Sequence, residues 1–253
     1  MTDRTKTSEH KSRLIAGLAI VLLLIVILGV GWHSMTPSSS PSTSTVSIHP
    51  DSSSSSMVYA STTASGSFNL ATSLLSGVPP TLGSPNASVT IVEFGDYQCP
   101  TCGGWYRSQE AQLIKNLVRT DKAKLVWRDF DFFGPDSVSA SEAAYAAGEQ
   151  GKFWQFHDLL FQSQQTPNSG WASKQNMETI ARQLGLNMTQ FDQSFKSGKY
   201  DSLVNSNHSL GVQAGVSETP TFFLIGPNGK IVTIAGGQPE SVFEQAVASL
   251  TSG

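Results

Sequence analysis

The stretch 89–102, with the sequence VTIVEFGDYQCPTC, decides the fold. Its first part is a short apolar run of β-branched and aromatic residues, which predicts a buried strand. Gly95 and Asp96 break this run. The apolar residues of 109–117 then recur at helical spacing, so we expect the two cysteines to open a helix.

The two cysteines are placed for redox chemistry. Cys99 would lie at the N-terminal edge of the helix and Cys102 on the same face, so the two sulfurs can form a disulfide. Pro100 fits the first helical turn, where its missing N–H is not needed. Free backbone N–H groups and the helix dipole should lower the pKa of Cys99 from about 8.5 into the range of about 3.5–7.5. A lowered pKa stabilises the reduced pair and favours passing a disulfide to another protein.

Two cysteines at this spacing could also form half of a zinc site or a structural disulfide. They are the only cysteines in the chain, and the five histidines show no paired-ligand spacing. A disulfide here would close a short loop and would remove little chain entropy. The sequence therefore favours a redox pair and predicts neither a metal site nor a cofactor.

The order of these features resembles the DsbA branch of the thioredoxin superfamily. A strand containing 92–94 comes first, and the dipeptide 96–97 forms the turn after it. The motif Cys-Pro-Thr-Cys at 99–102 then provides the cysteine pair and opens the helix. The resemblance covers residues 82–253, and we assign the catalytic domain to 81–253. It implies an α/β thioredoxin fold with a helical domain inserted at about 135–214.

The rest of the domain follows from hydrophobic patterns. Residues 124–130 predict a second strand, parallel to the first, and 230–235 the last strand after a turn at 227–229. Helical spacing recurs across the insertion, and residues 240–250 predict the closing helix. His157 lies within a helical pattern, where a packing or surface role is favoured over catalysis.

Thr219 and Pro220 enter an apolar strand far downstream of the cysteines. A proline is tolerated at a strand start. In the superfamily the matching proline is cis and faces the cysteine pair, so the resemblance implies a cis Pro220. A cis bond would turn the backbone of Thr219 outward, where it could pair with an extended substrate chain beside Cys99.

Glu93 is a carboxylate inside an apolar strand. The resemblance implies that it lies buried beneath the disulfide and moves protons for Cys102, and burial would raise its pKa. The alternative is a residue on the outward face of an edge strand. Asp96 would repel a nearby thiolate, so we expect its side chain to point away.

The N-terminus predicts a membrane anchor. Residues 1–13 are polar with an excess of basic residues, and residues 14–32 are almost wholly apolar. A helix over 14–32 would span about 28 Å, close to the hydrocarbon core of roughly 30 Å. The basic flank places the N-terminus in the cytoplasm and the catalytic domain outside, where disulfides persist. A cleaved signal peptide is the alternative, but the apolar run is long for one and no cleavage site follows promptly.

Residues 33–80 are rich in serine, threonine and proline, which predicts a disordered linker. Within it, residues 68–75 are more apolar and could dock on the domain. The net charge of −3 and the lack of a basic patch give no indication of nucleic-acid binding.

Together these features predict an extracytoplasmic thiol:disulfide oxidoreductase that oxidises exported proteins. A substrate thiolate would attack Cys99, the exposed sulfur, while Cys102 stays more buried. A membrane partner of the DsbB or VKOR kind would reoxidise the pair. Thr101 replaces the histidine of the most oxidising relatives, so a reductase or isomerase, for instance in cytochrome assembly, is an alternative. A non-enzymatic alternative is a tethered chaperone, adaptor or metallochaperone.

Overall fold

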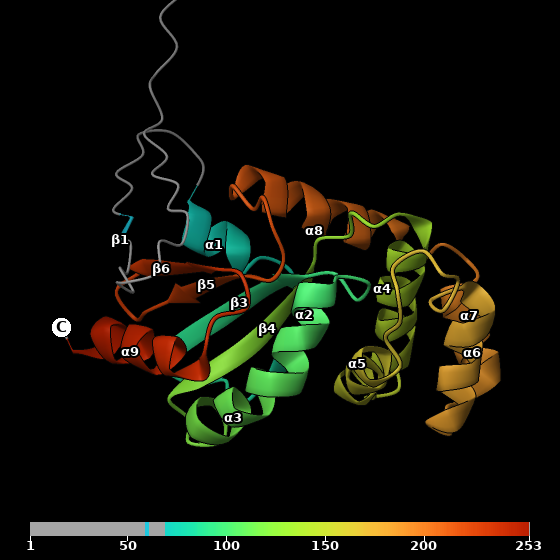
Figure 1. Cartoon of the computed structure of the whole chain (residues 1–253), viewed down its shortest axis with the longest axis horizontal. Coiled ribbons are helices and arrows are strands. Elements are labelled where there is room, and N and C mark those ends of the chain that lie inside the picture. Colours follow the sequence, from blue (N-terminus) through green and yellow to red (C-terminus); the bar gives the residue numbers. More distant parts are fainter. Residues whose placement is uncertain (1–58, 61–68, 253) are drawn as a thin grey trace, which may run out of the picture. The chain divides into compact units, whose positions relative to one another are not determined.

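The computed structural model describes residues 59–60 and 69–252. Its described strands form one mixed sheet in the order β1-β6-β5-β3-β4-β2 (Figure 1). The central strand β3 pairs in parallel with β4 and antiparallel with β5. The strands are β1 (Tyr59–Ala60), β2 (Thr81–Leu82), β3 (Val89–Gly95), β4 (Ala123–Asp129), β5 (Thr221–Ile225) and β6 (Ile231–Ala235). The predicted thioredoxin-like α/β architecture is therefore confirmed.

Helices cover both faces of the sheet (Figure 1). One face carries the cysteine helix and α9, the other α1 and α8. Because side chains alternate along a strand, Val89 and Ile91 of β3 pack in the first core, whereas Val92 and Phe94 pack in the second. Glu93 shares the face of Ile91 and so points toward the cysteine helix. The helices named here are α1 (Leu70–Leu74), α8 (Asp201–Gln213) and α9 (Glu240–Thr251).

The cysteine helix is continuous but not regular. It runs from α2 (Pro100–Trp105) through the π-helical turn η1 (Tyr106–Glu110) and α3 (Ala111–Leu113) to a second π-helical turn, η2 (Ile114–Val118). Each π-helical turn widens the helix and changes which side chains face the core. Glu110, at the end of η1, is buried.

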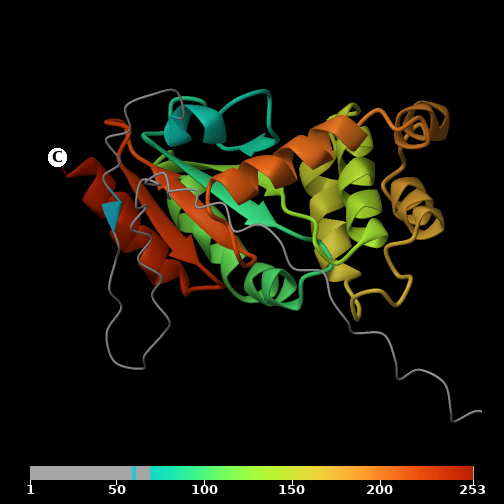
Figure 2. The ribbon, with the colours of Figure 1, turned by 90° about the horizontal axis from the view of Figure 1, so that it is seen from above.

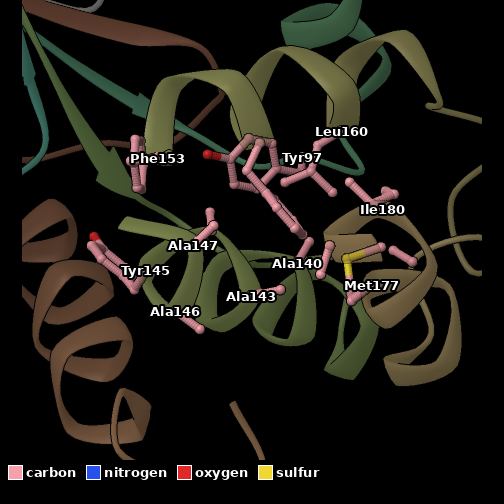
Figure 3. Close-up of a cluster of buried hydrophobic side chains, with 14 of the residues drawn as sticks. Tyr97, Ala140, Ala143, Tyr145, Ala146, Ala147, Phe153, Leu160, Met177 and Ile180 are labelled. Atoms are coloured by element: carbon pink, nitrogen blue, oxygen red, sulfur yellow. The ribbon is translucent and has the colours of Figure 1, made fainter. Parts of the chain in front are cut away.

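Helices α4–α8 fill the chain between β4 and β5, where the helical insertion is predicted. Alanines of α4 let neighbouring helices approach closely, and Tyr97 projects from the cysteine loop into this core beside Leu160 (Figure 3). Helix α8 then leads from the insertion back over the sheet (Figure 2). The remaining helices are α4 (Pro135–Gly148), α5 (Phe153–Gln162), α6 (Lys174–Gln183) and α7 (Met188–Phe195).

The predicted linker ends earlier than residue 80. Leu74 of α1 is fully buried against the sheet, and Nη2 of Arg128 donates hydrogen bonds to the carbonyl oxygens of Leu74, at 3.1 Å, and of Ser76. The prediction of disorder is therefore wrong for 69–80, because an apolar side chain and a buried guanidinium hold this segment. The proposed docking of the apolar stretch is confirmed for its described part.

The other N-terminal predictions fall outside the described residues. They are the cytoplasmic segment 1–13, the anchor 14–32 and most of the linker. Within the part of the chain that is described, no helix has both the length and the apolar character needed to cross a membrane.

Candidate redox site

Cys99 is the N-cap of α2, and Pro100 occupies the first helical position. Both cysteines are free thiols in the structure. The pKa of Cys99 is lowered to about 6, first by a hydrogen bond from the Cys102 thiol and then by the hydroxyl of Thr219 and the backbone N–H groups of Cys102 and Thr101, although burial acts in the opposite direction. This agrees with the predicted range, but the partner thiol contributes more than the helix end.

Cys102 is more deeply buried than Cys99, and its pKa is shifted in the opposite direction. Its side chain is fully buried, and burial raises its pKa well above the ordinary value. The Cys99 hydrogen bond and the charges of Cys99 and Glu93 act in the same direction. At neutral pH the pair therefore holds one thiolate, on Cys99, and one thiol, on Cys102.

The exposure predicted for Cys99 is wrong. Only 4 % of the residue is accessible, compared with 0 % for Cys102. The sulfur is covered from the side of the cis-proline loop, where Sγ in its thiol form donates a hydrogen bond to the carbonyl oxygen of Thr219 at 3.3 Å. Cys99 is the more accessible of the two cysteines, as predicted, but it is itself buried.

The Thr219–Pro220 peptide bond is cis, as predicted. It joins the end of the insertion to β5 and places Thr219 directly against Cys99. Thr219 is 5 % exposed, and its hydroxyl makes no hydrogen bond within the described residues, so it is available to donate to the Cys99 thiolate. The expected outward-facing backbone is thus engaged with Cys99 in this form of the protein.

Glu93 is buried in the centre of the sheet, at 1 % exposure, and not at an outward edge. Desolvation raises its pKa well above the ordinary value, and the charges of Glu110 and Cys99 raise it further. Glu93 also influences Cys102 electrostatically. A carboxyl group whose burial favours the protonated form therefore lies behind the cysteine pair.

Asp96 has its own partners away from the sulfurs. One carboxylate oxygen accepts a hydrogen bond from the backbone N–H of Gln98 at 2.8 Å, and the other accepts from Phe132 at 2.9 Å and from Phe133. These bonds lower the pKa of Asp96, but desolvation outweighs them and raises it. Asp96 thus fixes the cysteine loop to the segment after β4.

Two glutamines that the sequence analysis missed hold the cysteine loop to the insertion. Gln164 donates from Nε2 to the carbonyl oxygens of Tyr97 and Cys99, at 2.8 and 2.9 Å. Gln98 donates to the Ser137 hydroxyl at 3.0 Å. Gln98 borders the cysteine motif, but no local pattern marks Gln164, because its partners are far away in sequence.

His157 is completely buried, so the predicted surface role is wrong and the packing role is confirmed. Its ring packs edge-on against Trp127 and Tyr97, and Nδ1 lies 3.1 Å from the Tyr97 hydroxyl. Nε2 lies 3.5 Å from an oxygen of Glu110. A buried group of titratable side chains thus continues from Glu93 into the insertion.

The comparisons with known proteins agree with this arrangement. The family model described as Thioredoxin matches residues 76–238. The chain is 28 % identical over 150 residues to the probable disulfide bond formation protein D of Bacillus anthracis, covering 57 % of this chain and 69 % of the relative. Oxidised BdbD from Bacillus subtilis superposes with a TM-score of 0.62 at 23 % identity, over 69 % of this chain and 94 % of that one.

A second group of relatives, which are antiporters, matches this chain over only a small part of their own length. The chain is 32 % identical over 146 residues to the Na(+)/H(+) antiporter NhaA 1 of Salinispora arenicola, over 57 % of this chain but 21 % of the antiporter. The match therefore concerns a small part of that relative. The matched family model shows that the chain belongs to the thioredoxin family, and together with the relatives named disulfide bond formation protein it supports a thiol:disulfide oxidoreductase.

Proposed function

We propose that this oxidoreductase acts as an oxidase, donating a Cys99–Cys102 disulfide to exported proteins that carry thiols. The main support for this proposal is the difference between the pKa values of the two thiols. The pKa of Cys99 is lowered to about 6, whereas that of Cys102 is raised well above its ordinary value. A stable thiolate favours the reduced pair at pH 7, so the oxidised pair tends to accept electrons.

The reaction begins when a substrate thiolate attacks Sγ of Cys99. The new bond joins the substrate sulfur to Cys99, and the bond to Cys102 breaks, leaving a thiolate on Cys102. A second substrate thiolate then attacks the first substrate sulfur and releases Cys99. The substrate loses two electrons and gains a disulfide, and the cysteine pair gains both. The lowered pKa of Cys99 makes it a good leaving group in this second step.

Glu93 has the properties of the proton donor for the first step. The thiolate released at Cys102 lies in a buried environment that strongly favours the thiol. Burial raises the pKa of Glu93 well above its ordinary value and so favours its protonated form, while the ionised form would raise the pKa of Cys102. We therefore assign to Glu93 the transfer of a proton to Cys102 as the disulfide opens.

The reduction potential tests the direction of electron flow. The pKa of Cys99 lies between those of about 7 for thioredoxin and about 3.5 for DsbA. We therefore expect a potential between about −270 and −120 mV, measured by equilibration with glutathione. A value at or below that of thioredoxin would indicate a reductase and would contradict the oxidase.

Trapping experiments test the order of attack. Cys102→Ser, first converted at Cys99 to a mixed disulfide with glutathione by oxidised glutathione, should exchange glutathione for thiol-bearing partner proteins and accumulate mixed disulfides with them, because no second thiol in the site can displace the partner. Cys99→Ser should form none, and both variants should fail to oxidise a reduced, unfolded protein in vitro. Mixed disulfides that formed through Cys102 would reverse the assigned roles.

We further propose that residues 14–32 anchor the domain on the outer side of the cell membrane and that a membrane protein of the DsbB or VKOR kind reoxidises it. The apolar segment and its basic flank support this. Deleting residues 1–32 should slow reoxidation in cells while leaving thiol oxidation in vitro unchanged. Normal reoxidation of the truncated chain would count against a membrane partner.

A further inference from the structure

A second cluster of reactive side chains lies within the buried group that contains His157. Glu110 ends the π-helical turn η1, and His157 and Asp158 are neighbours on α5. One possible ligand atom from each residue lies within 4.8 Å of the others. We propose that Glu110, His157 and Asp158 form a binding site for a divalent cation of the zinc class.

The buried atoms of this cluster point to a ligand. The Glu110 side chain is 2 % exposed, and neither of its carboxylate oxygens accepts a hydrogen bond within the described residues. Nε2 of the fully buried His157 is likewise without a hydrogen-bond partner there, at 3.5 Å from Oε1 of Glu110. Leaving such groups unpaired is costly, and a cation bound between them would satisfy both.

Tyr97 sets the orientation of the histidine. Its hydroxyl lies 3.1 Å from Nδ1 of His157. When Nδ1 carries the ring proton and donates it to the tyrosine oxygen, the lone pair of Nε2 faces Glu110 and is free to bind a metal. Metal-binding histidines ordinarily have their second nitrogen held by a hydrogen bond in this way.

Asp158 supplies the third ligand at the edge of the protein. It is half-buried, and its Oδ1 accepts a hydrogen bond from the Tyr106 hydroxyl at 3.3 Å. Glu110 and Asp158 both line a cavity of about 440 Å³, together with Trp154. The cavity provides a route for the ion and space for water molecules to complete its coordination.

The donor set selects the kind of metal. One imidazole nitrogen and two carboxylate oxygens suit Zn²⁺, which binds both ligand types, better than Mg²⁺ or Ca²⁺, which prefer oxygen alone. The sequence gives no spacing signal because Glu110 comes from one helix and the adjacent pair from another.

Zinc titration of the whole oxidised chain tests the proposal, because the disulfide removes the two thiols as competing ligands. Isothermal titration calorimetry should show one Zn²⁺ per chain, and metal analysis after gel filtration should confirm it. Glu110→Gln and Asp158→Asn should each weaken binding at least tenfold. Asp136→Asn, which changes an acid of α4 that does not line the cavity, should bind Zn²⁺ like the unaltered chain.

Spectroscopy separates this site from adventitious surface binding. Co²⁺ should give visible absorption bands that Zn²⁺ removes, and Asp158→Asn should change them. No measurable Zn²⁺ binding, or binding that neither Glu110→Gln nor Asp158→Asn weakens, would overturn the proposal and leave Glu110 and His157 as a buried side-chain contact. Since Asp158 is half-buried, its variant keeps the test valid even if Glu110→Gln unfolds the protein.

Discussion

The Sγ atom of Cys99 lies 3.3 Å from the carbonyl oxygen of Thr219, a residue 120 positions away in the chain. The contact brings the cis-proline loop against the first cysteine and places the Thr219 hydroxyl where it lowers the thiol pKa. The reactivity of Cys99 therefore depends on two distant segments and not on the helix end alone.

Thr219→Val should raise the pKa of Cys99 above about 6, because it removes a donor to the thiolate while keeping the side-chain shape. Thiolate absorbance near 240 nm measured against pH would show the shift. Thr221→Val is the matched control, since the Thr221 hydroxyl donates to Glu218 at 2.7 Å and not to the sulfur. An unchanged pKa in Thr219→Val would show that the other donors suffice.

The free energy of unfolding of the reduced form should increase relative to that of the oxidised form as pH rises from about 6 to about 8.5. The pKa of Cys99 is about 6 in the folded reduced protein and near 8.5 when unfolded, so folding favours the thiolate. This gain in the free energy of unfolding is complete above the pKa of Cys99 in the unfolded protein. It is lost as the pH falls through the pKa of Cys99 in the folded protein. At pH 7 it amounts to about 1.4 kcal/mol. Urea unfolding of both redox forms would measure it, and Cys99→Ser should abolish the pH dependence.

Glu93→Gln should slow disulfide opening and also stabilise the protein at neutral pH. Burial raises the pKa of Glu93, so the folded state opposes its ionisation, and this cost grows as pH rises from the unfolded value of about 4.3 to the folded one. Glutamine removes the cost but cannot donate the proton. We therefore expect Glu93→Gln to raise the free energy of unfolding at pH 7 but not at pH 4.

Stopped-flow oxidation of a thiol substrate and urea unfolding test the two effects of Glu93→Gln separately. A purely structural role would change stability without altering the pH dependence of the oxidation rate. Glu142→Gln is a suitable control, because its carboxyl also has a raised pKa, of about 7, but influences neither cysteine.

Gly103→Ala should destabilise the domain by about 1–3 kcal/mol, whereas Gly104→Ala should be neutral or slightly stabilising. A Cβ at Gly103 would lie 1.8 Å from Oε1 of Gln164, but one at Gly104 would meet nothing within 4 Å. Gln164 would have to leave the carbonyl oxygens that it holds at Tyr97 and Cys99. Thermal unfolding compares the two variants.

A double substitution tests whether Gln164 is the cause. Gly103→Ala combined with Gln164→Ala should cost less than the sum of the two single changes, because both remove the same contact. Strict additivity would mean that the clash at Gly103 arises from other atoms.

Leu74→Ala should destabilise the domain by about 2–5 kcal/mol, because it leaves a cavity where α1 packs on the sheet. Leu75→Ala, next to it in the chain, should change stability by no more than about 0.5 kcal/mol, because Leu75 is 41 % exposed. Equal effects in urea unfolding would mean that α1 is not firmly docked.

The sequence alone was sufficient to predict the central strand, the cysteine helix and the parallel second strand. Each has a local signal, either an apolar run or the Cys-Pro-Thr-Cys motif. The cis bond before Pro220 was expected from the resemblance to the thioredoxin superfamily and not from a local pattern. The alternation along β3 also determines that Glu93 shares the face of Ile91. Such short-range patterns carry most of the architecture, because they fix which side of each element faces the core.

Only the tertiary structure decided how the site is enclosed. The contact of Thr219 with Cys99, the bonds from Gln164 and the approach of Glu110 to His157 all join segments far apart in sequence. The same holds for α1, which Arg128 binds from β4 although its sequence resembles a linker. Burial and pKa depend on these distant neighbours, because desolvation and hydrogen bonding are properties of the packed surroundings and not of the local chain.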